Sequence, residues 1–175
     1  ITESSGKPLI VCIGRDNRSR RKYENHIHEQ LRYARALNRM ATSIMNSDGA
    51  AETLLREMTT ICGETIGVER ALLFDIRMTE GVAQSVAKWI RQDFTDFAPL
   101  QEVYPTSVFA SSIKQLHSSR TYISSAANAP HTCFKEEGSA EILHQAMNVQ
   151  SLLWYPFSFR DDGFFLLVVN DMKHL

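Results

Sequence analysis

Three side chains in the C-terminal half of the chain, His131, Cys133 and His144, are of the types that ligate metals or act in thiol catalysis. His117 could join them in a ligand set. Zinc or iron needs three or four converging ligands, usually supplied in part by paired motifs such as Cys-x-x-Cys, and the sequence has no such pair. We therefore expect no metal site and no catalytic residues, and we interpret His131 to Cys133 as part of a solvated loop.

A second set of residues is apolar or aromatic and suits a small-molecule pocket. Strand alternation places Leu72, Phe74 and Ile76 on one face of a predicted strand, and Leu153 and Tyr155 on one face of a later strand. Trp154 is a further aromatic residue that could line such a pocket. The alternative is a closed core without a ligand. The candidate pocket residues are Leu72, Phe74, Ile76, Trp89, Phe109, Tyr122, Leu153 and Tyr155.

Composition excludes several classes of function. The 175 residues are 43% hydrophobic and carry a formal net charge of −1, so there is no broad electrostatic attraction to nucleic acid or to an anionic membrane. The longest apolar runs, such as 164–169, are too short to cross a bilayer. The three cysteines lie far apart, which is typical of a reducing compartment. We predict a cytoplasmic protein with no cofactor.

The N-terminal part predicts a strand followed by a long helix. Residues 8–13 are β-branched and apolar, and Asp16 or Asn17 can cap a helix over 16–46. Apolar positions in this helix follow alternating steps of four and three, which predicts a homodimeric coiled coil. The alternative is an amphipathic helix that packs on its own domain, with Leu31 and Met40 widening the apolar stripe. The seam residues are Tyr23, Ile27, Gln30, Ala34, Leu37, Ala41 and Ile44.

The remainder predicts an α+β domain with an antiparallel sheet of about six strands and helices on its faces. A helix that begins at Ser47 or Asp48 buries a face containing Leu54, Leu55, Met58, Ile61, Cys62 and Ile66, and Gly63 and Gly67 mark its end. Two hairpins are predicted, one over 71–90 and one over 151–170, the second turning at an Asp-Gly pair. Loops are predicted over 91–105 and 124–138. Helices are predicted from Thr106 or Ser107 to Leu116 and over 139–147, and a short strand over 121–123.

Residues 47–171 resemble a GAF domain. The segments that carry the resemblance are "DGAAETLLREMTTICGETIGVERALLFDI" and "AEILHQAMNVQSLLWYPFSFRDDGFFLLVV", in that order and at similar spacing. The resemblance implies a profilin-like α+β fold, with Phe74 and Tyr155 at pocket-side positions. Asn148 stands where the family usually has a glycine. The family usually continues into another helix, so we expect residues 47–175 to be a GAF domain without its C-terminal helix.

The segment "GKPLIVCIGRDNRSRRKYENHIHEQL" resembles the end of a PAS domain. We therefore expect residues 1–15 to be the last strand of an upstream PAS domain and residues 16–46 to be a signalling helix. Because the first residue is Ile1, we also expect the sequence to be part of a longer protein. The PAS–helix–GAF order resembles bacterial sensor histidine kinases and cyclic-dinucleotide signalling enzymes.

These resemblances imply a regulatory domain, without catalytic activity, that senses a small ligand or relays a signal through a dimeric helix. Bilin-binding relatives carry a Cys-His pair where this chain has Ser139 and Ala140, so no covalent bilin is expected there. The Asn-Lys-Phe-Asp-Glu set of cyclic-nucleotide-binding relatives is also missing. The alternatives are a dimerisation scaffold without a ligand and a small redox enzyme of the same fold that uses Cys133.

Overall fold

A computed structural model describes residues 17–46, 51–94 and 101–172. The predicted strand over 8–13 lies outside these residues. The chain divides into two units between Arg35 and Ala36, and each is described by itself.

Helix α1 (Arg18–Asn46) confirms the long N-terminal helix. In its first part, Tyr23 and Ile27 are exposed, and in the second unit Leu37 is also exposed, at 66% of its surface. Ala36 is buried, and Arg39 pairs with Glu64 of the next helix at 3.0 Å. The predicted seam therefore stays exposed even in the part of α1 that is tied to the domain.

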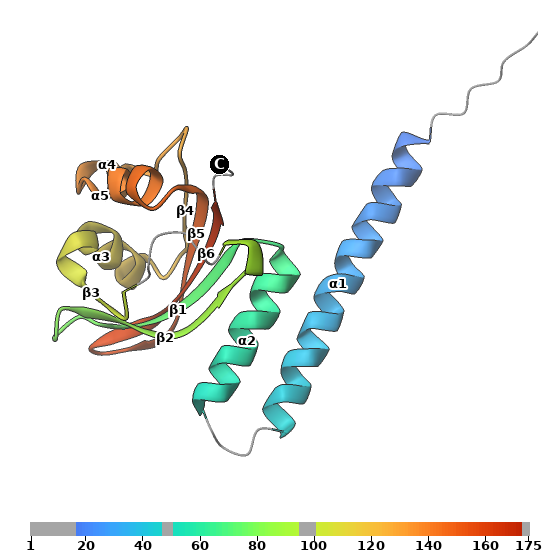
Figure 1. The fold of residues 1–175 in the computed structure, drawn as a ribbon, viewed down its shortest axis with the longest axis horizontal. Coiled ribbons are helices and arrows are strands. Elements are labelled where there is room, and N and C mark those ends of the chain that lie inside the picture. Colours follow the sequence, from blue (N-terminus) through green and yellow to red (C-terminus); the bar gives the residue numbers. More distant parts are fainter. Residues whose placement is uncertain (1–16, 47–50, 95–100, 173–175) are drawn as a thin grey trace, which may run out of the picture. The chain divides into compact units, whose positions relative to one another are not determined.

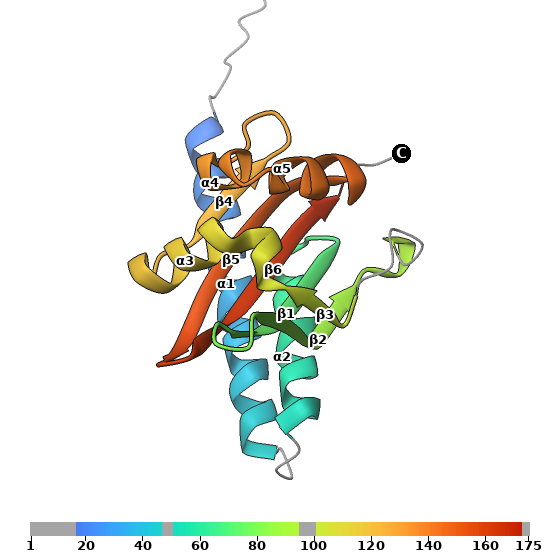
Figure 2. The ribbon, with the colours of Figure 1, turned by 90° about the vertical axis from the view of Figure 1, so that its left-hand side faces the viewer.

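Helix α2 (Ala51–Ile66) covers one face of the sheet (Figures 1 and 2). Ile61 and Thr59 are buried as part of its inner face, whereas Leu55 is only half-buried and Ile66 is exposed, contrary to the predicted apolar face. Gly63 was predicted to mark the end of this helix, but it lies inside the helix and is buried. Its role is therefore in packing rather than termination.

The sheet has six antiparallel strands in the order β3-β2-β1-β6-β5-β4, which confirms the predicted fold class (Figure 2). The hairpins β1–β2 and β5–β6 correspond to the two predicted hairpins. Strand β3 lies inside the segment predicted as a loop, where it pairs with β2 and ends at Pro105. The strands are β1 (Arg70–Arg77), β2 (Val82–Ile90), β3 (Val103–Pro105), β4 (Ile123–Ala126), β5 (Val149–Arg160) and β6 (Gly163–Met172).

Short helices cover the other face of the sheet. Helix α4 falls within the predicted loop over 124–138, where Phe134 anchors it because its side chain is completely buried. The predicted helix over 139–147 is instead a short α-helical turn followed by a π-helical turn. These elements are η1 (Gln92–Phe94), η2 (Thr106–Phe109), α3 (Ala110–Ser119), α4 (Thr132–Glu136), α5 (Ser139–Glu141) and η3 (Ile142–Ala146).

The N-terminus of α3 is capped by a residue distant in sequence. One carboxylate oxygen of Glu137 accepts hydrogen bonds from the backbone N–H groups of Ser111 and Ser112, at 2.9 and 3.2 Å. The other oxygen accepts from the hydroxyls of Ser112 and Ser139, at 2.6 and 2.7 Å. The helix was predicted to begin at a Thr106 or Ser107 cap, but these residues belong to η2. Glu137 thus satisfies two of the free N–H groups of the first turn and joins α3 to α5.

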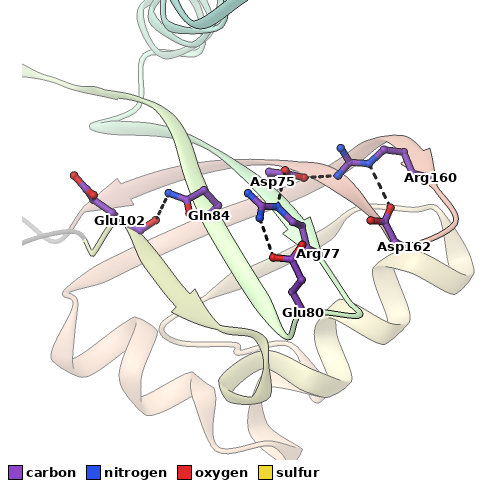
Figure 3. A network of polar contacts seen from close by, with 7 residues as sticks. All are labelled: Asp75, Arg77, Glu80, Gln84, Glu102, Arg160 and Asp162. Atoms are coloured by element: carbon purple, nitrogen blue, oxygen red, sulfur yellow. Dashed lines mark hydrogen bonds and ion pairs between the residues drawn. The ribbon is translucent and has the colours of Figure 1, made fainter.

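Acidic and basic side chains connect the two hairpins at the β1–β2 turn (Figure 3). The carboxylate of Asp75 binds both Arg77, at 3.2 Å, and Arg160 of β5. Arg77 also binds Glu80 at 2.9 Å, and these carboxylates raise the pKa of the Arg77 guanidinium. The cluster is partly exposed, so it orients the hairpins more than it stabilises them.

Candidate functional site

A small apolar cavity of about 60 Å³ lies between the sheet and the helices that cover it. Side chains of β1, β5 and β6 form its floor. On the helical side, the cavity is lined by Ile113 of α3, by Phe109 of η2, by Leu143 of the π-helical turn η3 and by Met147, which follows this turn. The lining residues are Leu72, Phe74, Ile76, Ala83, Tyr104, Phe109, Ile113, Leu143, Met147, Trp154, Leu166, Val168 and Asn170.

Strand register determines which side chains reach this cavity. Leu72 of β1 pairs with Val168 of β6, and Val168 pairs with Trp154 of β5. These three residues therefore share one face of the sheet. Phe74 pairs with Leu166 on the same face. Two edge-to-face aromatic contacts involve lining residues: the ring centroids of Phe74 and Tyr104 are 5.9 Å apart, and those of Phe109 and Trp154 are 5.2 Å apart.

The structure brings four of the predicted pocket residues to the cavity: Leu72, Phe74, Ile76 and Phe109. The other four, described in the next two paragraphs, do not line it.

Trp89 and Tyr122 lie away from the cavity. Trp89 pairs with Ala71 on the opposite face of the sheet, where its ring covers Gly63 of α2. Tyr122 precedes β4 and is 60% exposed.

Leu153 and Tyr155 also lie on the opposite face. Tyr155 pairs with Leu167, which pairs with Leu73, and Tyr155 is 51% exposed. The cavity residue of this strand is Trp154. Alternation correctly places Leu153 and Tyr155 on one shared face, but it does not show which face of β5 meets the cavity; the pairing of β5 with β6 decides that.

Two polar atoms of cavity residues are buried. Trp154 is 5% exposed and Asn170 is 3% exposed. Neither the indole N–H of Trp154 nor the side-chain oxygen of Asn170 has a hydrogen-bond partner among the residues that the structure describes. Asn170 was absent from the predicted set, although a lone amide at the end of the apolar run 164–169 is a visible signal in the sequence.

Arg70 lies in the cross-strand row of Asn170 and is completely buried, but it does not line the cavity. Burial lowers the pKa of its guanidinium, and the nearby Tyr104 has a smaller opposing effect. Tyr104 does line the cavity, and its hydroxyl accepts a hydrogen bond from the backbone N–H of Gln101 at 3.1 Å.

A serine and a histidine are paired beside the π-helical turn. The Nδ1–H of His144 donates to the carbonyl of Val149 at 2.8 Å, so the Nε2 atom accepts from the hydroxyl of Ser125 at 2.9 Å. That hydroxyl also accepts from the backbone N–H of His131. Ser125 is buried and lines no cavity described here, so the pair connects β4 to the π-helical turn rather than presenting a nucleophile.

The surroundings of Cys133 disfavour its thiolate. Burial raises the pKa of the thiol, and the charges of Glu136 and Glu137 raise it further. The thiol donates a hydrogen bond to the side-chain carbonyl of Gln115. These effects are opposite to those that activate catalytic cysteines.

Over the described ranges, no three or more His, Cys, Asp or Glu side chains gather in a way that could hold a metal ion. In the same ranges, no helix has the length and apolar character needed to span a bilayer.

The fold is similar to that of GAF domains of known structure. The chain superimposes on the phycoerythrobilin-bound GAF domain of a cyanobacterial phytochrome with a TM-score of 0.67 and 16% identity, covering 83% of this chain and 86% of that one. For a phycocyanobilin-bound GAF domain from a cyanobacterial phytochrome the TM-score is 0.64 and the identity is 17%, and the match covers 81% of this chain and 82% of that one. For residues 122 to 287 of a methyl-accepting chemotaxis protein the TM-score is 0.57 and the identity is 17%, and the match covers 81% of this chain and 85% of that one.

No protein-family description and no curated protein matches the sequence. The structural similarity shows that the chain has the GAF fold. The segment expected to belong to a PAS domain lies outside the described residues.

Proposed function

We propose that this chain is the regulatory sensory domain of an intracellular signal-transduction protein, in which a small ligand in the cavity alters the pairing of α1 between two copies. The observation that carries this proposal is the cavity itself, because the side chains around an empty apolar space lose packing contacts that a bound molecule would supply. Sensor histidine kinases and cyclic-dinucleotide signalling enzymes are the parent proteins that we favour.

The exposed seam of α1 supports pairing with a second copy. Tyr23 is 71% exposed, Ile27 57% and Leu37 66%, at the steps of four and three that a coiled coil needs. A row of exposed apolar side chains along one helix is stabilised when a partner helix covers it. A homodimer through the 16–46 helix would then join two sensory domains.

Sedimentation of the full chain tests the pairing. Leu37→Glu places a charge on the seam and should turn the dimer into a monomer, because two such carboxylates would face each other in a parallel pair. Asn38→Glu adds the same charge one residue further along the helix, off the seam, and should leave the dimer intact. Equal masses for the two variants would contradict the proposed dimer, as would a monomeric parent chain.

A dimerisation scaffold without a ligand is the second candidate, and the same exposed seam favours it. The two candidates differ in the cavity. In a scaffold, the pocket-filling change Ala83→Leu should leave the dimer geometry unchanged. In a sensor, it should alter the pairing of α1 between the two copies, as a bound ligand would. The distance between spin labels attached at position 38 of the two copies would distinguish them. The redox alternative is less favoured because the surroundings of Cys133 hold its thiol protonated.

A further inference from the structure

Glu69 is a buried acidic residue at a corner where α2 and three strands meet. It lies in the turn between α2 and β1 and is only 3% exposed. Its backbone N–H donates to the carbonyl of Asn170 in β6 at 3.1 Å, and its backbone carbonyl accepts from the N–H of Arg91, which follows β2, at 2.8 Å. The backbone of Glu69 therefore connects β1 to both of its neighbouring strands just before β1 begins.

The side chain of Glu69 makes the same connection a second time. One carboxylate oxygen accepts a hydrogen bond from the backbone N–H of Met172 at 2.9 Å, and the other forms an ion pair with Arg91 at 2.9 Å. The pairing of β1 with β6 begins at Arg70, so Met172 lies beyond this ladder and the carboxylate takes the place of a strand partner. The guanidinium of Arg91 lies over the ring of Phe94 in η1, at 4.5 Å from the ring centroid.

Opposing effects act on the charge of this carboxylate. Burial raises the pKa of Glu69 and the neighbouring Asp171 raises it further, whereas the N–H of Met172 and the charge of Arg91 lower it. An ion pair in buried surroundings contributes little net free energy, because the loss of hydration offsets most of the attraction. Opening this contact should therefore cost less than opening the ladder between the central strands.

Glu69 is also connected closely to α2. This helix ends at Ile66, and the N–H of Gly67, at φ 80°, donates to the carbonyl of Gly63 at 2.9 Å. A glycine in the left-handed conformation is a common helix end and gives a tight turn. Gly67 and Val68 alone separate the helix from Glu69. A displacement of the end of α2 is therefore passed to Glu69.

We propose that the Glu69 side chain, through its contacts with Met172 and Arg91, is a clasp that couples the position of α2 to the last residues of β6. When α2 shifts, Glu69 moves with it, the hydrogen bond to Met172 opens, and the end of β6 separates from the corner. Arg91 is the positioning residue that holds the carboxylate in place. The inference rests on the proposed sensory function and adds to it a route from the helices to the residues that follow β6.

Hydrogen exchange of the backbone amides in the full chain tests the clasp. Glu69→Gln keeps the size of the side chain and removes its charge, so the amide of Met172 should exchange about tenfold faster relative to the amide of Val168 in the middle of β6. Arg91→Gln removes the other side of the ion pair and should act in the same direction. Glu80→Gln is the matched control, because Glu80 also pairs with an arginine at 2.9 Å, but at the other end of β1. It should leave this ratio unchanged.

A change in α2 tests the coupling. Gly63→Ala should push α2 away from β2, because the new Cβ atom would be 2.0 Å from the ring of Trp89. In the parent chain this substitution should shift the amide signal of Met172 in a ¹H–¹⁵N spectrum. In the Glu69→Gln chain, where the clasp is open, the same substitution should leave that signal nearly unmoved. The comparison does not depend on whether the chain forms a dimer.

Three outcomes would overturn the proposal. An unchanged exchange rate at Met172 in both clasp variants would mean that Glu69 does not hold the end of β6. An equal acceleration at Met172 and Val168 would mean that Glu69 supports the fold as a whole. No shift of the Met172 signal on Gly63→Ala, or an equal shift with and without Glu69, would mean that α2 does not act through this residue. Sedimentation of the Leu37→Glu variant tests the dimer of the proposed function separately.

Discussion

The ring of Trp89 lies directly over the backbone of Gly63, so closely that a Cβ atom at position 63 would be 2.0 Å from Trp89 Cε3. This contact brings α2 against β1 and β2 on the face opposite the cavity. It explains why a glycine is tolerated inside a helix, where alanine would be preferred by about 1 kcal/mol. It also explains why Trp89 is unavailable to the cavity.

We predict that Gly63→Ala lowers the free energy of unfolding by about 1–2 kcal/mol, because overpacking outweighs the gain in helix propensity. Urea denaturation measures the loss. In a Trp89→Ala background the same change should be neutral or stabilising, since the clash is gone. An equal loss in both backgrounds would show that the contact is not responsible.

Phe74 borders the cavity, whereas Phe164 is completely buried and stacks on Phe159. Phe164→Ala should cost about 3–5 kcal/mol because it leaves a new cavity in a filled core. Phe74→Ala should cost less, by about 1 kcal/mol or more, since it loses fewer contacts. Urea denaturation of the two variants compares the same truncation at two sites. A loss at Phe74 as large as that at Phe164 would argue for a closed core.

Glu137 lies in a surface turn, but its carboxylate accepts four hydrogen bonds near the start of α3. We therefore expect its side chain to contribute to the stability of the fold. Glu137→Ala should lower the free energy of unfolding by about 2 kcal/mol, because buried donors of the first turn lose their partner. Glu136→Ala is the matched control, since Glu136 is exposed, and should change stability by less than about 0.5 kcal/mol. Thermal denaturation of the two variants measures the difference.

The pKa of the Cys133 thiol is raised by burial and then by Glu136 and Glu137. The thiolate therefore forms at a higher pH than in an unfolded chain, and alkylation by iodoacetamide should be slower at pH about 8.5, where a free cysteine is half ionised. A chain with Cys12→Ser and Cys62→Ser isolates the signal, and the urea-unfolded chain is the reference. Adding Glu136→Gln should move the rate–pH curve back toward lower pH. Faster alkylation in the folded chain would revive the redox alternative.

The sequence by itself determined the elements whose signal is local. The helix over 16–46 has a repeat with steps of four and three and contains no glycine or proline from Arg18 to Met45. Both hairpins have alternating strands with turn residues between them. The α+β class follows from the order of these elements. The face of β1 that lines the cavity was also predictable, because Leu72, Phe74 and Ile76 alternate strictly.

Only the tertiary structure decided the remainder of the cavity. The pairing of β5 with β6 places Trp154 rather than Tyr155 against the cavity, whereas the alternation within β5 is compatible with either face. Gly63 has the signature of a helix end, but the approach of Trp89 gives it a packing role. Asn170 lines the cavity and is buried because β6 lies between β1 and β5 in the sheet. Such relationships join residues far apart in the chain, and no local pattern records them.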